Sequence, residues 1–329
     1  MDAKITKNRL GLLLSYDWIK IVCICLAVVL LWMLIFTMTA TRATDGQIFD
    51  LYSYIGVRFN TDNMASLEQL RERDAFSDDV LAFNVSAVNQ DGYENMILQT
   101  WMMAGQGDAL FTADTGPERD ENGNITAYTG LSEFLMAATY RVNSRWLGED
   151  DYSDGTFTYG PSYFTQCAEY LNRFYPGGYE GGTLDNMNKA AVEENFRSRI
   201  EGDKRYKNEM QIAEGLEKEY ARIQNLRDAF AAVYEWTHNE SADDPIELRT
   251  IEVEGDTDGD NQPDKTFRWT YAFDLSNLEN ITELVSNDGS AEGVCMVVLS
   301  SGCIDEVDLS FEQFTLLKYL ADRYDTSAG

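Results

Sequence analysis

The stretch "VSAVNQDGYENMILQTWMMAGQGDALFTAD", residues 85–114, decides the fold class of this chain. It begins inside an apolar run, Val80–Val88, that predicts a strand, and it ends in a second short apolar strand over Asp108–Asp114. Between them lies a segment with apolar residues at helical spacing, closed by Gly105 as a natural C-terminal cap. A strand, a helix and a strand this close together form a crossover between parallel strands, which predicts an α/β fold. The apolar helical positions are Tyr93, Ile97, Trp101 and Ala104.

The same two periodicities continue on both sides of this unit. Alternating or continuous apolar runs rich in β-branched and aromatic residues indicate strands, and a three- and four-residue spacing indicates helices. The strands over 246–255 and 266–275 are predicted to pair as a hairpin. Besides these two strands, further strands are predicted over 48–59 and 293–301. Further helices are predicted over 63–76, 131–147, 204–237 and 310–324.

The breaker-rich stretch "YPGGYEGG", Tyr175–Gly182, is the best internal boundary of the chain. We therefore predict two α/β lobes, the first over about 46–175 and the second, with a helical section, over about 183–325.

A long apolar stripe runs along Lys204–Thr237 with a period close to that of a coiled coil. The simpler interpretation is one long helix lying on its own domain, and the alternative is a dimerising coiled coil. The stripe comprises Tyr206, Met210, Ala213, Leu216, Tyr220, Ile223, Leu226, Phe230 and Val233.

The run Ile21–Met38 carries no charged residue and predicts a transmembrane helix over residues 19–41. A cleaved signal peptide is the alternative, but its apolar core is usually only about 7–15 residues long. Basic residues dominate the leader at residues 1–18, so the positive-inside rule predicts a cytoplasmic N-terminus and an extracellular domain over residues 42–329. The basic residues before the apolar run are Lys4, Lys7, Arg9 and Lys20.

The formal net charge of −30 excludes most nucleic-acid partners, because such a surface repels phosphate backbones and anionic lipid headgroups. The chain has a single histidine, His238, and no G-x-S-x-G, H-E-x-x-H or phosphate-binding glycine loop. A lone histidine at the end of a predicted helix is more often a capping or surface residue than a catalytic one. The sequence therefore predicts a protein that is not an enzyme.

The acidic stretch "DTDGDNQPD", Asp256–Asp264, falls at the tip of the predicted hairpin. Its alternate oxygen-bearing side chains suit Ca²⁺, which takes six to eight oxygen ligands, and Gly259 allows a sharp turn. We predict a structural Ca²⁺ site here, with a solvated acidic turn as the alternative. The stretch also resembles the aspartate-rich calcium loops of dockerin-like and thrombospondin type 3 repeats. The expected metal ligands are Asp256, Asp258, Asp260, Gln262 and Asp264.

Three cysteines follow the apolar run, namely Cys167, Cys295 and Cys303. A disulfide between Cys295 and Cys303 is one arrangement, and free buried thiols are the preferred interpretation.

The opening stretch also resembles the first lobe of bacterial extracellular solute-binding proteins of ABC importers, with Ala104, Gly105, Gly107 and Asp108 matching a small-residue turn after the helix. The segments Trp269–Val285 and "FEQFTLLKYL" are similar to other parts of such proteins, and the whole chain resembles membrane-anchored proteins of Gram-positive anaerobes. The resemblance implies a two-lobed periplasmic-binding-protein-like fold, a sugar or peptide ligand, and ABC permease subunits as partners.

Ligands of open α/β sheets bind beyond the carboxyl ends of the strands. Tyr54 and Asp114 follow or end predicted strands, and Trp101 and Trp269 offer ring faces for stacking, although each Trp also fits an ordinary core. We therefore expect a membrane-anchored solute-binding-like protein with these four ligand-binding residues. The alternative is a cell-surface interaction or scaffolding protein without a small-molecule ligand.

Overall fold

The computed structural model describes residues 7–39, 43–88, 93–122, 125–154, 157–239, 241, 243–255, 265–300 and 311–325. Ala43–Gly202 and Tyr206–Gly329 make up one compact unit, and the N-terminal helix belongs to a separate unit. Each unit is considered by itself.

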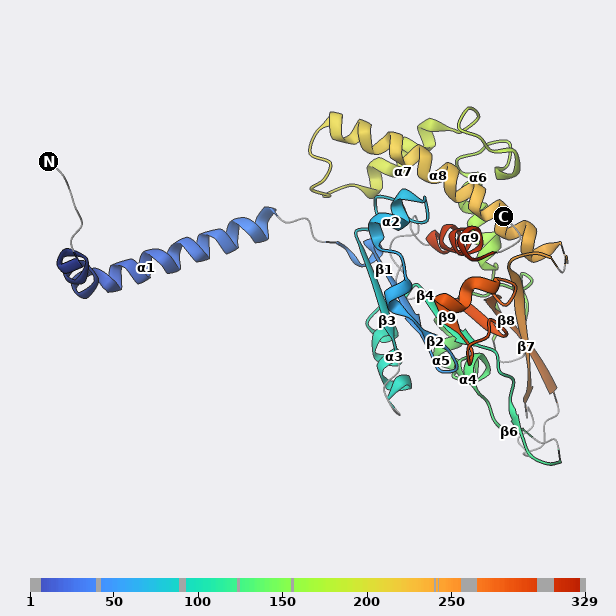
Figure 1. The fold of residues 1–329 in the computed structure, drawn as a ribbon. Coiled ribbons are helices and arrows are strands. Elements are labelled where there is room, and N and C mark those ends of the chain that lie inside the picture. Colours follow the sequence, from blue (N-terminus) through green and yellow to red (C-terminus); the bar gives the residue numbers. More distant parts are fainter. Residues whose placement is uncertain are drawn as a thin grey trace. The chain divides into compact units, whose positions relative to one another are not determined.

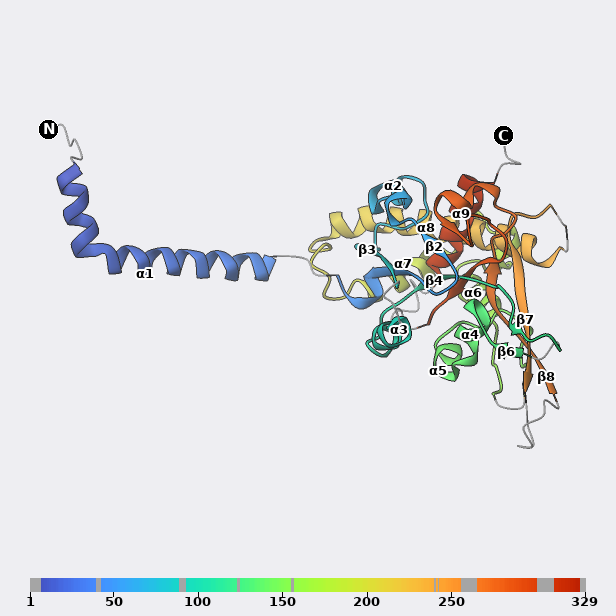
Figure 2. The same ribbon diagram turned by 60° about the horizontal axis from the view of Figure 1, so that its bottom comes forward.

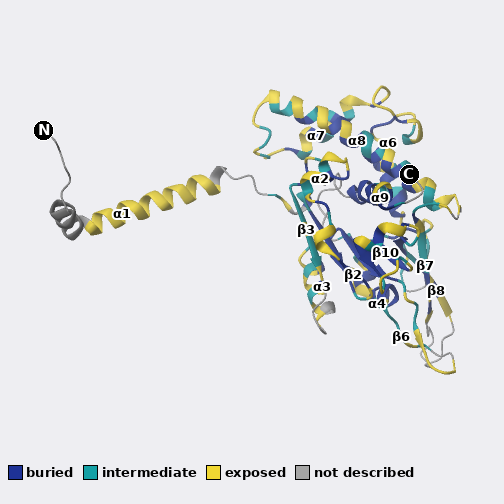
Figure 3. Cartoon of the chain, viewed as in Figure 1, coloured by how far each residue is buried: buried dark blue, intermediate teal, exposed yellow. Residues whose placement is uncertain are grey.

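The N-terminal helix α1 spans Lys7–Thr39. Its segment Trp18–Thr37 is long and apolar enough to cross a membrane, and within the described part of the chain it is the single helix that meets this test. No residue of that window is buried, so its Trp, Leu, Ile and Phe side chains are exposed on every side of the helix (Figure 3). A helix that is apolar all round suits a lipid environment.

The compact unit is built on one six-stranded mixed sheet in the order β3-β1-β4-β10-β8-β7 (Figure 1). The first three strands are parallel, which confirms the predicted crossover, and the last three are antiparallel to their neighbours. The hairpin of β7 and β8 is also as predicted. The strands are β1 (Ile48–Ser53), β3 (Ala82–Ala87), β4 (Ala109–Ala113), β7 (Glu247–Gly255), β8 (Lys265–Asp274) and β10 (Val294–Val298).

The strands assigned to two lobes lie together in this one sheet. Strand β10 pairs with β4 through Met296 and Phe111, and with β8 through Met296 and Phe273. It thereby joins the strands before and after the Tyr175–Gly182 boundary, so the described residues contain one large sheet where the sequence predicted two lobes. The single sheet has a physical reason. Because β10 is buried on both faces, its backbone groups need hydrogen-bond partners from a strand on each side.

Helices cover both faces of the sheet (Figures 1 and 2). Along β10 the side chains alternate, so that Val294, Met296 and Val298 belong to one apolar cluster and Cys295 and Val297 to the other. The first cluster takes in α2 (Leu67–Glu72), α6 (Tyr163–Asn172), α7 (Lys189–Arg199), α8 (Glu209–His238) and α9 (Glu312–Tyr324), and the second takes in α3 (Glu94–Met103), α4 (Gly130–Met136) and α5 (Ala138–Val142).

Short elements complete the unit. Ala137 adopts an extended conformation and divides the helix predicted over 131–147 into α4 and α5. The small pairs and turns are β2 (Arg58–Phe59) with β9 (Val285–Ser286), β5 (Glu118–Arg119) with β6 (Ile125–Ala127), and the 3-10 turns η1 (Asp45–Gln47), η2 (Thr61–Asn63), η3 (Tyr179–Gly181) and η4 (Glu279–Glu283).

The long helix α8 packs on its own domain, as the simpler interpretation predicted. The side chain of Asn208 accepts a hydrogen bond from the Gln211 amide and caps its first turn. The second half of the predicted stripe is buried against the rest of the unit, whereas Met210 near the start is exposed. The buried stripe residues are Tyr220, Ile223, Leu226, Phe230 and Val233.

Cys167 and Cys295 are free and buried. This confirms the preferred interpretation for these two thiols, and Cys303 lies outside the described residues.

Candidate functional site

Tyr54 and Asp114 lie at the same edge of the sheet, as predicted. They directly follow the parallel strands β1 and β4, which are neighbours. The Asp114 carboxylate accepts a hydrogen bond from the Gly116 amide at 3.2 Å and lies 3.7 Å from a guanidinium nitrogen of Arg249. Asp114 is therefore held within the protein by local partners.

The rings of Tyr54 and Trp101 both pack inside the unit. Tyr54 is fully buried and meets the ring of Phe134 edge-on at 5.5 Å. It also lines a cavity of about 290 Å³. Trp101 is half-buried and stacks on Tyr52 with ring centroids 4.6 Å apart, so one of its faces is covered.

Trp269 lies in the core between two polar partners. Its indole Nε1 donates to the carboxylate of Asp154 at 3.0 Å, and the Arg141 guanidinium lies 4.0 Å from its ring centroid. Only 4% of Trp269 is exposed. The structure thus supports the core alternative for Trp269, which belongs to the same apolar cluster as Tyr54.

The predicted calcium ligands, Asp256, Asp258, Asp260, Gln262 and Asp264, lie outside the described residues. Within the described residues, no group of His, Cys, Asp and Glu side chains is placed to hold a metal ion.

A cavity of about 620 Å³ lies at the C-terminal end of α8. Its walls come from the loop after α5, the first turns of α6, the turn η3, the last turns of α8, and the strands β7 and β8. Cavities of this size hold drug-sized ligands. We call it the aromatic cavity, because its lining includes Trp146, Tyr152, Phe164, Tyr179 and Tyr234 together with His238.

Parallel rings form one wall of the aromatic cavity. Trp146 stacks on Tyr152 at 5.1 Å and on Tyr159 at 4.5 Å, and Trp146 Nε1 donates to the carbonyl of Glu149 at 2.8 Å. Gly148 passes directly over the Trp146 ring, since a Cβ there would lie 2.2 Å from a ring carbon. The wall is therefore built by close contact between the loop backbone and the indole.

A stacked pair at the end of α8 forms another part of the lining. His238 stacks on Tyr234 with ring centroids 4.0 Å apart, and its Nδ1 lies 3.0 Å from the Tyr234 carbonyl oxygen. A carbonyl oxygen only accepts, so Nδ1 carries the proton in this contact and Nε2 carries the lone pair. Burial lowers the pKa of His238 more than this hydrogen bond raises it, which favours the neutral ring at pH 7.

Acidic and hydroxyl groups, together with the Arg268 side chain, supply the polar part of the lining. Asp150 lies at the start of α6, where it accepts hydrogen bonds from the Ser162 amide at 2.8 Å and from the Thr165 hydroxyl, while Ser162 itself caps the helix. The Ser162 amide holds the pKa of Asp150 below its usual range. Thr250 and Thr270 share a hydrogen bond of 2.7 Å across β7 and β8.

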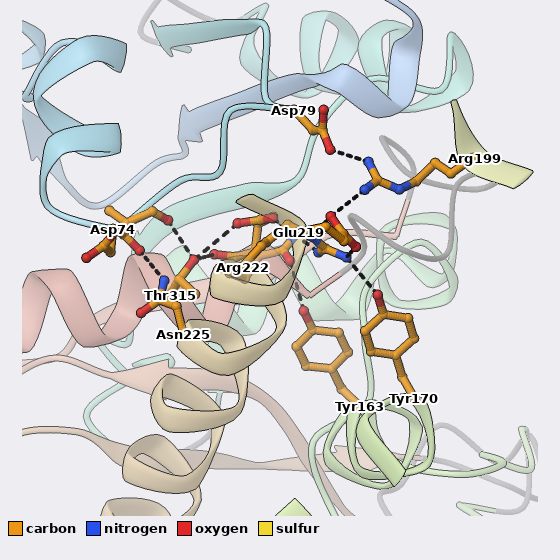
Figure 4. Close-up of polar contacts among 12 residues, drawn as sticks. Asp74, Asp79, Tyr163, Tyr170, Arg199, Glu219, Arg222, Asn225 and Thr315 are labelled. Atoms are coloured by element: carbon orange, nitrogen blue, oxygen red, sulfur yellow. Dashed lines mark hydrogen bonds and ion pairs between the residues drawn. The ribbon is translucent and has the colours of Figure 1, made fainter. Parts of the chain in front are cut away.

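A second polar cluster lies beneath the middle of α8 (Figure 4). Arg199 bridges Asp79 and Glu219, and Arg222 donates to Glu219 at 2.8 and 3.0 Å and to the Tyr170 hydroxyl at 2.8 Å. All the charged side chains in these contacts are at most 9% exposed. We call Asp79, Arg199, Glu219, Arg222 and Glu312 the buried charge network, since Arg222 also lies 3.5 Å from Glu312.

The two glutamates of the network differ in their pKa. Burial alone would raise the pKa of Glu219, but the Arg222 and Arg199 guanidiniums hold it below its usual value. Burial raises the pKa of Glu312, and the Arg222 guanidinium and the Ser77 hydroxyl, which both lower it, do not offset the effect of burial. The buried charge network thus contains two guanidiniums, which balance two of its three carboxyl groups. Glu312 is the third carboxyl group.

Sequence reasoning missed the aromatic cavity. Its loop, over 148–164, was predicted only as an irregular segment, although its density of Gly, Asp and Tyr is a usable signal for a loop that carries a binding wall. His238 was predicted as a capping or surface residue, and its contact with the last-turn carbonyl of Tyr234 agrees with that.

Comparisons with protein-family models, with curated proteins and with solved structures find no match to this chain.

Proposed function

We propose that this chain is a membrane-anchored ligand-binding protein that holds a sugar or short oligosaccharide in the aromatic cavity. The observation that carries the proposal is the aromatic cavity itself, a hollow of about 620 Å³ walled by rings and edged by a few polar groups. This combination of an apolar, aromatic lining with a small number of fixed polar groups is typical of small-molecule sites.

The lining fits a neutral sugar well. Aromatic faces pack against the flat C–H faces of a pyranose ring, while carboxylates and hydroxyl groups pair with its hydroxyl groups. Asp150 is ionised and accepts only, and neutral His238 supplies a further acceptor at Nε2. A binding role, without a reaction, is enough to account for these groups.

The apolar helix supports the anchored part of the proposal. With Trp18–Thr37 in a bilayer and the basic leader in the cytoplasm, the compact unit faces the outside, where it meets free sugars. The same proposal includes delivery of the bound ligand to ABC permease subunits and a structural Ca²⁺ site at the predicted hairpin tip. Binding in the aromatic cavity needs no closure of two lobes, so it is compatible with the single sheet.

The alternative of an interaction protein loses its main support, because much of the apolar stripe of α8 is already covered by its own domain. It stays an outcome of the test below.

The test is calorimetric titration of the detergent-solubilised full chain with mono- and oligosaccharides and with short peptides. We expect at least one sugar to bind, and Tyr234→Ala and His238→Gln to weaken that binding. Tyr93→Ala is the matched control, because Tyr93 is an exposed tyrosine outside the cavity lining. If no sugar binds to the chain, or if Tyr234→Ala binds like Tyr93→Ala, the proposal is wrong. If no ligand binds and the chain forms a dimer in solution, the result would favour the interaction protein.

A further inference from the structure

Exposed apolar side chains of the compact unit gather on three helices, α3, α4 and α5. Within the part of the unit that the structure describes, eight large apolar side chains are exposed, and five of them belong to these helices or directly precede them. The helices lie side by side and cover the face of the sheet that carries Tyr54 (Figures 1 and 2). The five residues are Tyr93, Met96, Met103, Met136 and Val142.

A groove of about 290 Å³ is lined jointly by the three helices, with the buried Tyr54 among its lining. Each exposed methionine on these helices lies about one helical turn from a residue that lines the groove, and residues three or four apart are neighbours on a helix surface. The pairs are Met96 and Met103 with Gln99, Met136 with Glu133, and likewise Val142 with Thr139. We call this groove, together with Met96, Met103, Met136 and Val142, the methionine groove.

The helices around the methionine groove carry few charges for this chain, in which a quarter of all residues are charged. Their charged residues are Glu94, Glu133 and Arg141, and Arg141 is buried. A surface helix normally turns charged residues towards water, whereas α3 turns Met96 and Met103 there, with 58% and 76% of these residues exposed. Depletion of charge together with enrichment of methionine is typical of the core of a protein interface.

The dimensions of the methionine groove suit a helix. Met96 and Met103 are seven residues apart on α3, which is two helical turns or about 10.5 Å along the axis. A bound amphipathic helix presents its anchoring side chains with the same spacing of three, four and seven residues. Methionine side chains are flexible and adapt to the shape of such anchors.

The charge of the chain selects among the occupants. The formal net charge is −30, so a second copy and an anionic lipid surface are both repelled, and a basic partner is attracted. Glu133 is half-buried in the lining of the methionine groove and can pair with a lysine or arginine of that partner.

We propose that the methionine groove binds an amphipathic helix of another protein, with an apolar stripe that is flanked by lysine or arginine. The apolar stripe packs against Met96, Met103 and Met136, and a basic side chain pairs with Glu133. The proposal does not depend on sugar binding, because α8, whose end lines the aromatic cavity, covers the opposite face of the sheet.

The experiment is calorimetric titration of the full chain in uncharged detergent with three synthetic peptides of about four helical turns, or roughly 14 residues, with empty micelles as the blank. The first contains leucine along one face and lysine elsewhere. The second has the same composition in scrambled order, and the third has glutamate in place of lysine. We expect the first peptide to bind, the scrambled one to bind at least tenfold more weakly, and the glutamate peptide not to bind.

The double variant Met96→Gln with Met103→Gln should weaken binding of the first peptide about tenfold or more, because two apolar contacts are lost. Met210→Gln is the matched control, since Met210 is an exposed methionine on α8, and it should bind like the wild type. Glu133→Gln should weaken binding roughly two- to fivefold at low salt, and the difference should vanish near 1 M salt. Circular dichroism melting should be unchanged in these variants, because the replaced side chains are not buried.

Equal binding of the scrambled and the ordered peptide would show attraction by charge alone and overturn the proposal, as would equal affinity in the double variant and Met210→Gln. A dimer of the full chain that the double variant dissociates would assign the groove to a second copy, which also overturns it. Tyr234→Ala should bind the first peptide like the wild type, and a loss there would place the peptide in the aromatic cavity and refute the assignment to the methionine groove.

Discussion

Arg222→Met tests the role of the buried charge network. Arg222 is 5% exposed in its side chain and donates to both oxygens of Glu219 and to Tyr170. Methionine keeps much of the stem of the side chain but removes the charge and the donors. Within the part of the chain that the structure describes, Glu219 then keeps only Arg199 as a cation, and Glu312 loses its one close cation. Removing one partner of a buried pair costs roughly 3–5 kcal/mol, so we expect a loss of this size in the free energy of unfolding.

The assay is urea unfolding of the full chain in detergent, followed by circular dichroism. A loss of this size lowers the melting temperature by roughly 10 °C, at about 2–4 °C per kcal/mol for a large domain. The double variant Arg222→Met with Glu219→Leu should lose less than Arg222→Met alone. It removes the uncompensated carboxylate and leaves Arg199 paired with Asp79.

Arg197→Met is the matched control, because Arg197 pairs with Glu193 and Glu209 on the surface, where solvent screens the charges. It should unfold like the wild type. A loss below about 1 kcal/mol in Arg222→Met, or a double variant less stable than the single one, would refute this account of the network.

Three further outcomes are expected. Burial raises the pKa of Glu312, so the wild type should lose free energy of unfolding relative to Glu312→Gln as the pH rises from about 4 through the raised pKa of the folded state. Urea unfolding midpoints measured across this pH range test the expectation. Gly130→Ala should destabilise by about 1–3 kcal/mol, because Gly130 has φ +53° and a Cβ there would lie 2.0 Å from the Ala113 carbonyl oxygen, whereas Gly177→Ala meets open space and should be nearly neutral in the same assay. Protease added to intact cells should digest the compact unit, and protection until lysis would contradict the proposed orientation.

The elements of the sheet could be predicted from sequence because their signals are local. The apolar run of β4, the alternation along β8 and the stripe of α8 each repeat within a few residues, and burial follows the period of the element. The arrangement of those elements could not be predicted in the same way. The run Val294–Val298 shows that β10 is a central strand, but it does not say that β4 and β8 are its neighbours.

The predicted site residues illustrate the same limit. Tyr54 and Asp114 were predicted to follow or end strands, and they do follow β1 and β4, two neighbouring parallel strands whose ends meet at one edge of the sheet. Trp269 was a reasonable stacking residue by type, but its environment depends on Asp154 and Arg141, which are more than a hundred residues away in the sequence. No local pattern around Trp269 reports such partners. The aromatic cavity could not be predicted for the same reason, because its lining comes from six separate segments of the chain.

The long helix shows how local and distant signals combine. Its apolar stripe explains why α8 lies on the domain, but a stripe alone tolerates sliding and rotation, because one apolar contact resembles the next. The buried charge network removes this freedom, since Glu219 and Arg222 satisfy their partners in only one register. That register also fixes the end of the helix, where Tyr234 and His238 form a wall of the aromatic cavity. The charges at the centre of α8 therefore position a wall of the aromatic cavity that they do not touch.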